Sequence, residues 1–171
     1  LHAKGIDAFI RGFLYRLPLI IMMKLRLYPN YQAKQKVFSY FFKGMSLDTF
    51  NSLCLHFAEK NRHLLRSQAV ETLKQAQADG AEVLIISASI DNWVQPFFPD
   101  VKVLGTQIEV EDGQLTGRFK TKNCYGQEKV NRIKELYPHR EEYHLTAYGD
   151  SNGDRELLAF ADEAHYKPFR R

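Results

Sequence analysis

The chain has 171 residues, of which 44% are hydrophobic and 26% charged, with 10 Gly and 6 Pro. This composition excludes collagen-like, low-complexity and disordered chains, and the length excludes two large domains. The two cysteines, Cys54 and Cys124, form no CxxC pair, which argues against a disulfide scaffold or a Cys-rich zinc site and favours a reducing compartment.

The net charge of +4 is unevenly distributed along the chain. Residues 1–79 hold 12 Lys and Arg against 5 Asp and Glu, a net of +7, whereas residues 80–171 hold 12 against 15, a net of −3. This change predicts two domains, residues 1–78 and residues 79–171. We expect no nucleic-acid partner, because a charge of +4 is a weak electrostatic footprint and no RNP, helix-turn-helix or zinc-finger pattern occurs.

Helical periodicity dominates the first part of the chain. Apolar residues follow one helical face over residues 6–21, a second pattern runs through residues 37–41, and a third begins near Ser46. We expect the third helix to continue until Asp79-Gly80 supplies a stop. Residues 1–78 are therefore predicted to be an all-helical unit.

The N-terminal region carries no recognisable targeting signal. The first residue is Leu1 and no signal peptide follows it, so we expect a cytoplasmic protein whose natural start is missing. The apolar stretch over residues 13–23 is too short and too charged for a transmembrane helix. Basic residues flank the apolar face of residues 6–27, so this segment could instead make a peripheral membrane contact.

Short strands and helices alternate after Gly80. We expect strands over residues 83–86, 101–104 and 143–148, a hairpin over 106–110 and 114–119, helices over 127–136 and 154–161, and a last short strand at Tyr166. The first run is continuously apolar, which is typical of a strand buried on both faces. The alternation predicts an α/β fold with a largely parallel sheet.

The strongest local signal is the run Tyr148-Gly149-Asp150-Ser151-Asn152-Gly153-Asp154, between a predicted strand and a predicted helix. Two carboxylates four residues apart across this turn, Asp150 and Asp154, could address Mg²⁺, one directly and one through water. The alternative is a solvated turn in which Asp154 caps the helix. A calcium EF-hand is excluded, because the required Gly and bidentate Glu are not at their positions.

Two further residues could bind a phosphoryl group. Ser87 directly follows the apolar strand, where its hydroxyl and the next backbone N–H groups, beginning with Ala88, could hold a phosphoryl oxygen. A serine that merely caps the next helix is the alternative, and Ser89 fits that role better. Lys129 lies near the start of a predicted helix, and taken alone it would be interpreted as a solvated surface charge.

Taken in order, these segments resemble motifs II, III and IV of the haloacid dehalogenase superfamily, over residues 81–169. Within it they resemble the phosphoserine-phosphatase-like branch, on the runs Ile86-Ser87-Ala88-Ser89, Asn123-Cys124-Tyr125-Gly126-Gln127-Glu128-Lys129, Gly149-Asp150-Ser151-Asn152-Gly153-Asp154 and Tyr166-Lys167-Pro168-Phe169. The resemblance implies a Rossmann-like core over residues 79–171 and a helical cap over residues 1–78. It implies that Ser87, Ala88 and Lys129 hold the phosphoryl group, that Asp150 binds Mg²⁺, and that Asp154 ligates the metal or orients its water shell.

The first motif of that superfamily, Asp-x-Asp-x-Thr or Val, does not occur in the sequence. It supplies the nucleophilic Asp and an acid/base Asp at the end of a central strand. We therefore expect the sequence to be truncated ahead of Leu1 and unable to turn over alone by that mechanism. Loss of the central strand should also expose apolar strand edges.

The resemblance implies a Mg²⁺-dependent phosphomonoester hydrolase that forms an aspartyl-phosphate in its complete form. Its substrate stays open between a small-metabolite phosphate such as phosphoserine and a lipid phosphate such as phosphatidylglycerophosphate. The lipid interpretation depends on basic and aromatic residues of the cap, which could equally be core packing: Phe38, Tyr40, Phe41, Phe42 and Lys43. A catalytically inactive phosphate- or metal-binding protein and a membrane-surface module are the alternatives, and the oligomeric state is not predicted.

Overall fold

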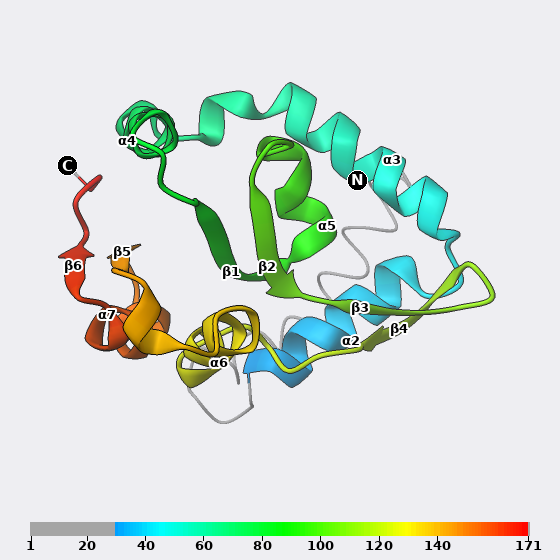
Figure 1. Ribbon diagram of the computed structural model, residues 1–171. Coiled ribbons are helices and arrows are strands. Elements are labelled where there is room, and N and C mark those ends of the chain that lie inside the picture. Colours follow the sequence, from blue (N-terminus) through cyan, green and yellow to red (C-terminus); the bar gives the residue numbers. More distant parts are fainter. Residues whose placement is uncertain (1–29, 171) are drawn as a thin grey trace. The chain divides into compact units, whose positions relative to one another are not determined.

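The computed structural model describes residues 30–170 of the chain (Figure 1). The predicted helix over residues 6–21 and the predicted membrane-contact segment over residues 6–27 lie outside this range. The described residues divide into two compact units, one made of residues 30–53 and Ile108–Thr121, the other of Cys54–Gln107 and residues 122–170. The predicted separation of a cap from a catalytic core at residue 78 concerns function and stays a prediction.

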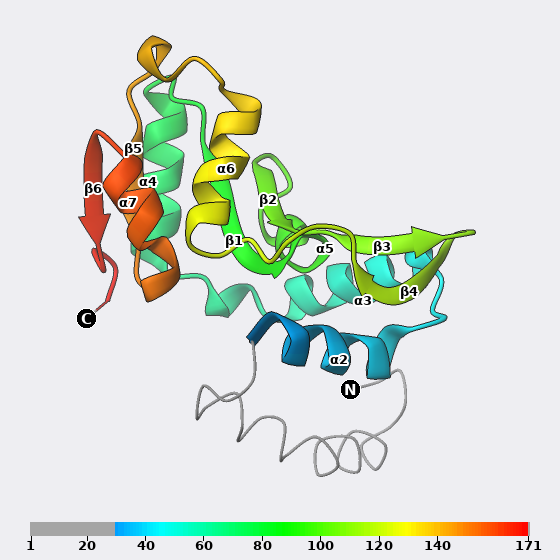
Figure 2. The same ribbon diagram turned by 90° about the horizontal axis from the view of Figure 1, so that it is seen from below.

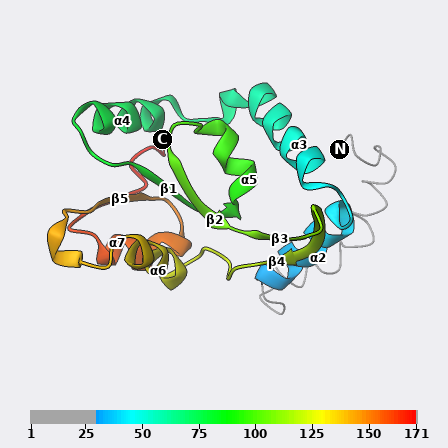
Figure 3. The same cartoon turned by 45° about the vertical axis from the view of Figure 1, so that its right-hand side comes forward.

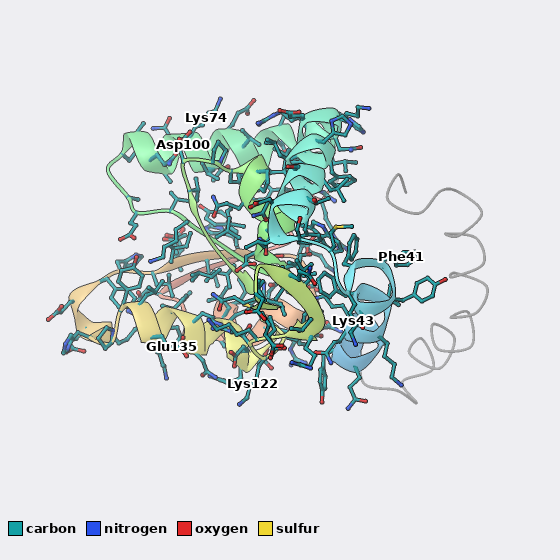
Figure 4. All side chains as sticks on the ribbon, turned by 90° about the vertical axis from the view of Figure 1, so that its right-hand side faces the viewer. Phe41, Lys43, Lys74, Asp100, Lys122 and Glu135 are labelled. Atoms are coloured by element: carbon teal, nitrogen blue, oxygen red, sulfur yellow. The ribbon has the colours of Figure 1, made fainter. Side chains whose placement is uncertain are left out.

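The first unit packs helices against a hairpin (Figure 2). Its elements are helix α2 (Asn30–Phe42), the first part of helix α3 (Leu47–Lys60), and the antiparallel strands β3 (Ile108–Glu111) and β4 (Gln114–Phe119). The buried ring of Phe38 packs edge to face on Phe50 at 5.7 Å between ring centroids and lies 5.6 Å from Phe119. Phe38 therefore builds the core, whereas Phe41 on α2 is half-buried and Lys43, which directly follows α2, is exposed (Figure 4).

The predicted continuous helix over residues 46–78 is wrong. Helix α3 ends at Lys60, a 3₁₀ helix follows over Arg62–Leu64, and helix α4 begins again over Ser67–Ala78. The side-chain amide of Asn61 donates to the Phe57 carbonyl at 2.7 Å, which satisfies an orphan acceptor at the end of α3. The Asn61 side chain thus ends helix α3 at Lys60, although apolar residues keep the helical spacing beyond that point.

The second unit contains two short parallel sheets (Figure 3). Strand β1 (Leu84–Ile90) pairs with β2 (Lys102–Thr106), and β5 (Thr146–Gly149) pairs with β6 (Glu163–Tyr166). Residues 84–86 are half-buried, not buried on both faces as predicted, because within residues 30–170 β1 has β2 as its one hydrogen-bonded neighbour. Parallel strands alternating with helices nevertheless confirm the predicted α/β fold.

Helices α6 (Gln127–Leu136) and α7 (Arg155–Phe160) pack on β5 around a buried apolar cluster. The cluster consists of Val130, Ile133, Ala147 and Leu157.

Both cysteines are buried free thiols, and burial raises the pKa of Cys54 to about 12. No helix in the described part of the chain is long and apolar enough to cross a membrane.

Arg140 and Asp162 join several residues of this unit, and we call this set of contacts the arginine clamp. The Arg140 guanidinium lies 4.9 Å from the Tyr143 ring centroid and 5.1 Å from that of Phe160, and it pairs with Asp162 at 2.6 Å. The Leu145 N–H also donates to Asp162 at 2.7 Å. The Leu145 N–H, followed by Arg140, lowers the pKa of Asp162 from its ordinary 3.8.

This clamp should make stability depend on pH. Because the folded pKa of Asp162 is lowered, its contribution is complete above the ordinary pKa and is lost as the pH falls through the lower folded value. We expect the free-energy difference between the unchanged chain and Asp162→Asn to stay constant while the pH is well above 3.8 and to shrink as the pH falls below 3.8. Urea unfolding at several pH values measures it, and a difference independent of pH would contradict the clamp.

Candidate active site

Ser87 lies in a bulge at the carboxyl end of β1. The pairing with β2 is regular from Leu84 to Ile86 and resumes only where Ile90 meets Thr106. Between them the Ser89 N–H turns to donate to the Ser87 hydroxyl at 3.1 Å. The residue at the N-cap of the next helix, α5 (Asp91–Val94), is Ile90, so the predicted capping role of Ser89 is wrong.

Gly105 and Thr106, two neighbouring residues of β2, allow this bulge to form. A Cβ atom at Gly105 would lie 2.8 Å from the Ser89 carbonyl oxygen, closer than packing permits. The fully buried Thr106 hydroxyl donates to the Ala88 carbonyl at 3.0 Å and accepts from the Cys124 N–H at 3.2 Å. The segment Ser87-Ala88 is thereby joined to the loop that precedes α6.

Lys129 connects the end of β1 to the loop after β5. Its Nζ donates to the Ile86 carbonyl at 2.8 Å and pairs with Asp154 Oδ1 at 2.6 Å. The residue is only 7% exposed, so the interpretation as a solvated surface charge is wrong. An ammonium group has three protons. These two contacts use two of them.

Asp154 organises the loop that follows β5. Its Oδ2 accepts from the Asp150 N–H at 3.2 Å, the Ser151 N–H at 3.0 Å and the Ser151 hydroxyl at 2.6 Å. Asp154 thus occupies the third position of a capping box that Ser151 begins, and its side chain makes no cap of its own on α7. Asp154 does stand at the N-cap position of α7, as the alternative predicts, but it is buried and not solvated, and its side chain does not cap that helix.

Burial and hydrogen bonding act in opposite directions on the Asp154 carboxyl. Burial alone would raise the pKa of Asp154, but the hydrogen bonds from Lys129 and Ser151 and the charge of Lys129 outweigh it and lower the pKa. The group is thus a stable carboxylate that holds the ammonium group in place.

Two glycines allow the loops to approach one another. A Cβ atom at Gly149 would lie 2.5 Å from the Asp154 Cβ, and one at Gly153 would lie 2.5 Å from the Tyr125 ring. The Gly126 N–H also donates to the Gly153 carbonyl at 2.9 Å. The loop before α6 and the loop after β5 are therefore packed backbone against side chain.

Substitution of Gly149 should disturb this arrangement. We expect Gly149→Ala to lower the free energy of unfolding by about 1–3 kcal/mol, because the new methyl group displaces Asp154 in a packed loop. Urea unfolding measures the loss. Thr146→Ala, an exposed change on the same strand, serves as the control, and a Gly149→Ala variant as stable as that control would contradict the close approach.

Asp150 is the carboxylate of this site that Lys129 does not contact. It lies directly after β5, its side chain is 49% exposed, and its Oδ2 lies 3.0 Å from Arg170 Nε. Within residues 30–170 no cluster of three His, Cys, Asp or Glu side chains could hold a metal ion. Mg²⁺, however, is often bound by one or two carboxylates together with water and substrate phosphate oxygens, and an exposed carboxylate such as Asp150 fits that pattern.

The structure brings most of the predicted site residues together. Ser87 and Ala88 directly follow Ile86, whose carbonyl Lys129 contacts. Lys129 also pairs with Asp154, and Asp154 accepts a hydrogen bond from the backbone of Asp150. Three contributing residues were missed from the sequence: Ser151, Thr106 and Arg170. The Ser-x-x-Asp spacing of the capping box could have indicated Ser151. No sequence signal marks the other two.

Comparison with known proteins identifies the class of this chain. A family model described as haloacid dehalogenase-like hydrolase matches residues 4–159, so the chain belongs to that family. Protein CicA of Caulobacter vibrioides is 37% identical over 136 residues, which cover 76% of this chain and 60% of CicA. The match thus spans less than two thirds of that relative.

Solved structures share the fold. A protein with unknown function from Bordetella pertussis Tohama I superposes with a TM-score of 0.78 at 21% identity, covering 92% of this chain and 74% of its own. A probable phosphoserine phosphatase from Vibrio cholerae gives a TM-score of 0.62 at 15% identity, covering 94% of this chain and 51% of its own. At these identities the likeness shows the fold alone and confirms the predicted architecture, whereas the family model confirms the predicted family.

Proposed function

We propose that this chain forms the greater part of a Mg²⁺-dependent phosphomonoester hydrolase. The observation that carries the proposal is the Lys129 ammonium group, buried between the Ile86 carbonyl on β1 and Asp154 in the loop after β5. The phosphoserine phosphatase among the similar structures supports a phosphorylated substrate.

Each residue of the site has a proposed role. The third N–H of Lys129 and the hydroxyl of Ser87, with the backbone at Ala88, bind the phosphoryl oxygens. Asp150 ligates Mg²⁺, and Asp154 positions Lys129 and the loop bearing Asp150. The bound ion would neutralise charge on the transferring phosphoryl group.

The nucleophile is proposed to come from an Asp-x-Asp segment on a strand that pairs with β1 and β5. Its first carboxylate attacks phosphorus, the bond from phosphorus to the leaving oxygen breaks, and the second Asp donates a proton to that oxygen. The second Asp, now a carboxylate, takes a proton from water as the water oxygen attacks the phosphorus of the aspartyl-phosphate. The bond from phosphorus to the first Asp oxygen breaks, which releases phosphate and restores both side chains. Apolar residues of β1, half-buried in the described chain, support this pairing.

The helices ahead of β1 are proposed to act as a cap that selects the substrate. Their aromatic residues include Phe38, which packs in a core, so an argument for an apolar substrate depends mainly on Phe41 and Lys43. A small-metabolite phosphate such as phosphoserine and a lipid phosphate such as phosphatidylglycerophosphate are both candidates. Peripheral membrane contact by residues 6–27 would accompany the lipid substrate.

The test uses a longer protein in which this chain is joined to the proposed Asp-x-Asp segment. We expect hydrolysis of phosphoserine or of phosphatidylglycerophosphate in mixed micelles, with loss of activity in EDTA and recovery on adding Mg²⁺. A faster rate on one substrate identifies the class, and co-sedimentation with anionic vesicles tests the membrane contact. Phosphate and Mg²⁺ binding without turnover would contradict the hydrolase and favour a binding protein.

A further inference from the structure

A second basic residue, Arg170, lies at the candidate cation site. Its Nε is 3.0 Å from Asp150 Oδ2, and both side chains are 49% exposed. Lys129 is committed to Asp154, so among the contacts of the described residues the guanidinium of Arg170 is the charge that balances Asp150. A carboxylate proposed to bind a divalent ion is therefore already paired with a cation from the chain itself.

The backbone holds Arg170 at this position. The Lys167 N–H donates to the Gly149 carbonyl at 2.7 Å, and Lys167 takes the left-handed φ of 56° that reverses the chain. The Arg170 N–H then donates to the Lys167 carbonyl at 3.2 Å. The turn is thus fastened to the residue that immediately precedes Asp150.

Contacts of Phe169 secure the same turn. Its ring stacks on Tyr148 at 5.6 Å between centroids, and its carbonyl accepts from the Arg66 guanidinium at 2.5 Å. The side chain of Arg170 is 49% exposed, whereas its backbone is anchored by these neighbours. Arg170 can therefore leave Asp150 without unfolding the turn.

We propose that Arg170 is a positioning residue that acts as a tethered cation: it occupies the Asp150 carboxylate until a divalent ion displaces it. This inference rests on the proposed function, which assigns Mg²⁺ to Asp150. Guanidinium and Mg²⁺ both bind carboxylate oxygens, and one carboxylate oxygen cannot serve both at full strength. The ion pair therefore weakens the apparent affinity for the metal and holds Asp150 oriented in its absence.

The expected size of the effect follows from the exposure of the pair. Exposed ion pairs alter an equilibrium by about two- to fivefold. We expect Arg170→Ala to bind Mg²⁺ about two- to fivefold more tightly than the unchanged chain at low ionic strength, with a smaller difference at high salt. The matched control is Lys167→Ala, which removes the same charge from the same turn and should change the affinity little.

Isothermal titration of the 171-residue chain with MgCl₂ measures these affinities, with Asp150→Asn as the variant expected to lose binding. Equal affinity in the unchanged chain and in Arg170→Ala, with binding lost in Asp150→Asn, would overturn the role of Arg170 and leave the proposed cation site intact. Mg²⁺ binding that is unchanged in Asp150→Asn, or that is absent from the unchanged chain and from every variant, would overturn both the role of Arg170 and the proposed cation site.

A second measurement does not depend on how the variants fold. The Nε–Hε resonance of Arg170 in the unchanged chain should shift toward that of a free guanidinium as MgCl₂ is added, with the same midpoint as the calorimetric titration. An Arg170 resonance that stays constant while the metal binds would contradict displacement.

Discussion

Replacing Lys129 by methionine is expected to lower the free energy of unfolding by about 3 kcal/mol. The change leaves the Asp154 carboxylate without its ammonium partner at a site where both side chains are 9% exposed. In the longer protein the same change should reduce turnover by roughly a hundredfold or more, because a preorganised donor to the phosphoryl group is lost. Urea unfolding measures the first effect and initial rates measure the second.

Two further variants separate this pair from general effects of charge. Lys134→Met removes an exposed ammonium group from the same helix and should cost less than about 1 kcal/mol. The double variant Lys129→Met with Asp154→Asn should be less destabilised than the sum of the single changes, since no buried charge is left without a partner. A Lys129→Met variant as stable as Lys134→Met would contradict the buried pair.

Asp150→Asn is expected to abolish Mg²⁺-dependent hydrolysis in the longer protein while leaving the fold nearly intact. The side chain is half-exposed and its ion pair with Arg170 is of the kind worth about 0–1 kcal/mol, so stability should change little. An amide keeps the shape of the carboxylate but loses the negative charge that binds the ion. Initial rates over a range of MgCl₂ concentrations measure the loss, and urea unfolding checks the fold.

Asp100→Asn is the matched control, because Asp100 is also an exposed carboxylate of the described chain (Figure 4). Its rates should equal those of the unchanged protein. Near-normal turnover by Asp150→Asn at saturating Mg²⁺ would mean that another residue supplies the ligand and that the assignment of Asp150 is wrong.

The sequence predicts the bounds of an element well where the spacing of its apolar residues agrees with the residues that mark its start and end. The helix over residues 127–136 has its predicted bounds, because Gly126 precedes it and its apolar residues keep the helical spacing. The break between Lys60 and Ser67 was missed, because the apolar spacing continues across it and only the Asn61 side chain reveals the stop. Periodicity records which face is apolar, not whether the backbone stays helical.

The sequence predicts which residues form the site better than it predicts the contacts between them. The resemblance singles out Lys129 and Asp154, whereas their pairing at 2.6 Å requires the approach of α6 to the loop after β5. The steric need for Gly149 likewise arises from an atom five residues later in the chain. Arg170 meets Asp150 only because Lys167 reverses the chain, a feature that no motif encodes.

The contacts of Lys129 also concern the order in which the chain folds. One of them spans 43 positions, back to Ile86, and the other reaches forward to Asp154. Closing long loops lowers chain entropy before any contact is gained, so we expect the site to assemble late on the folding pathway. Lys129→Met should then accelerate unfolding and leave the refolding rate nearly unchanged, which makes this ammonium group a determinant of how long the folded state persists.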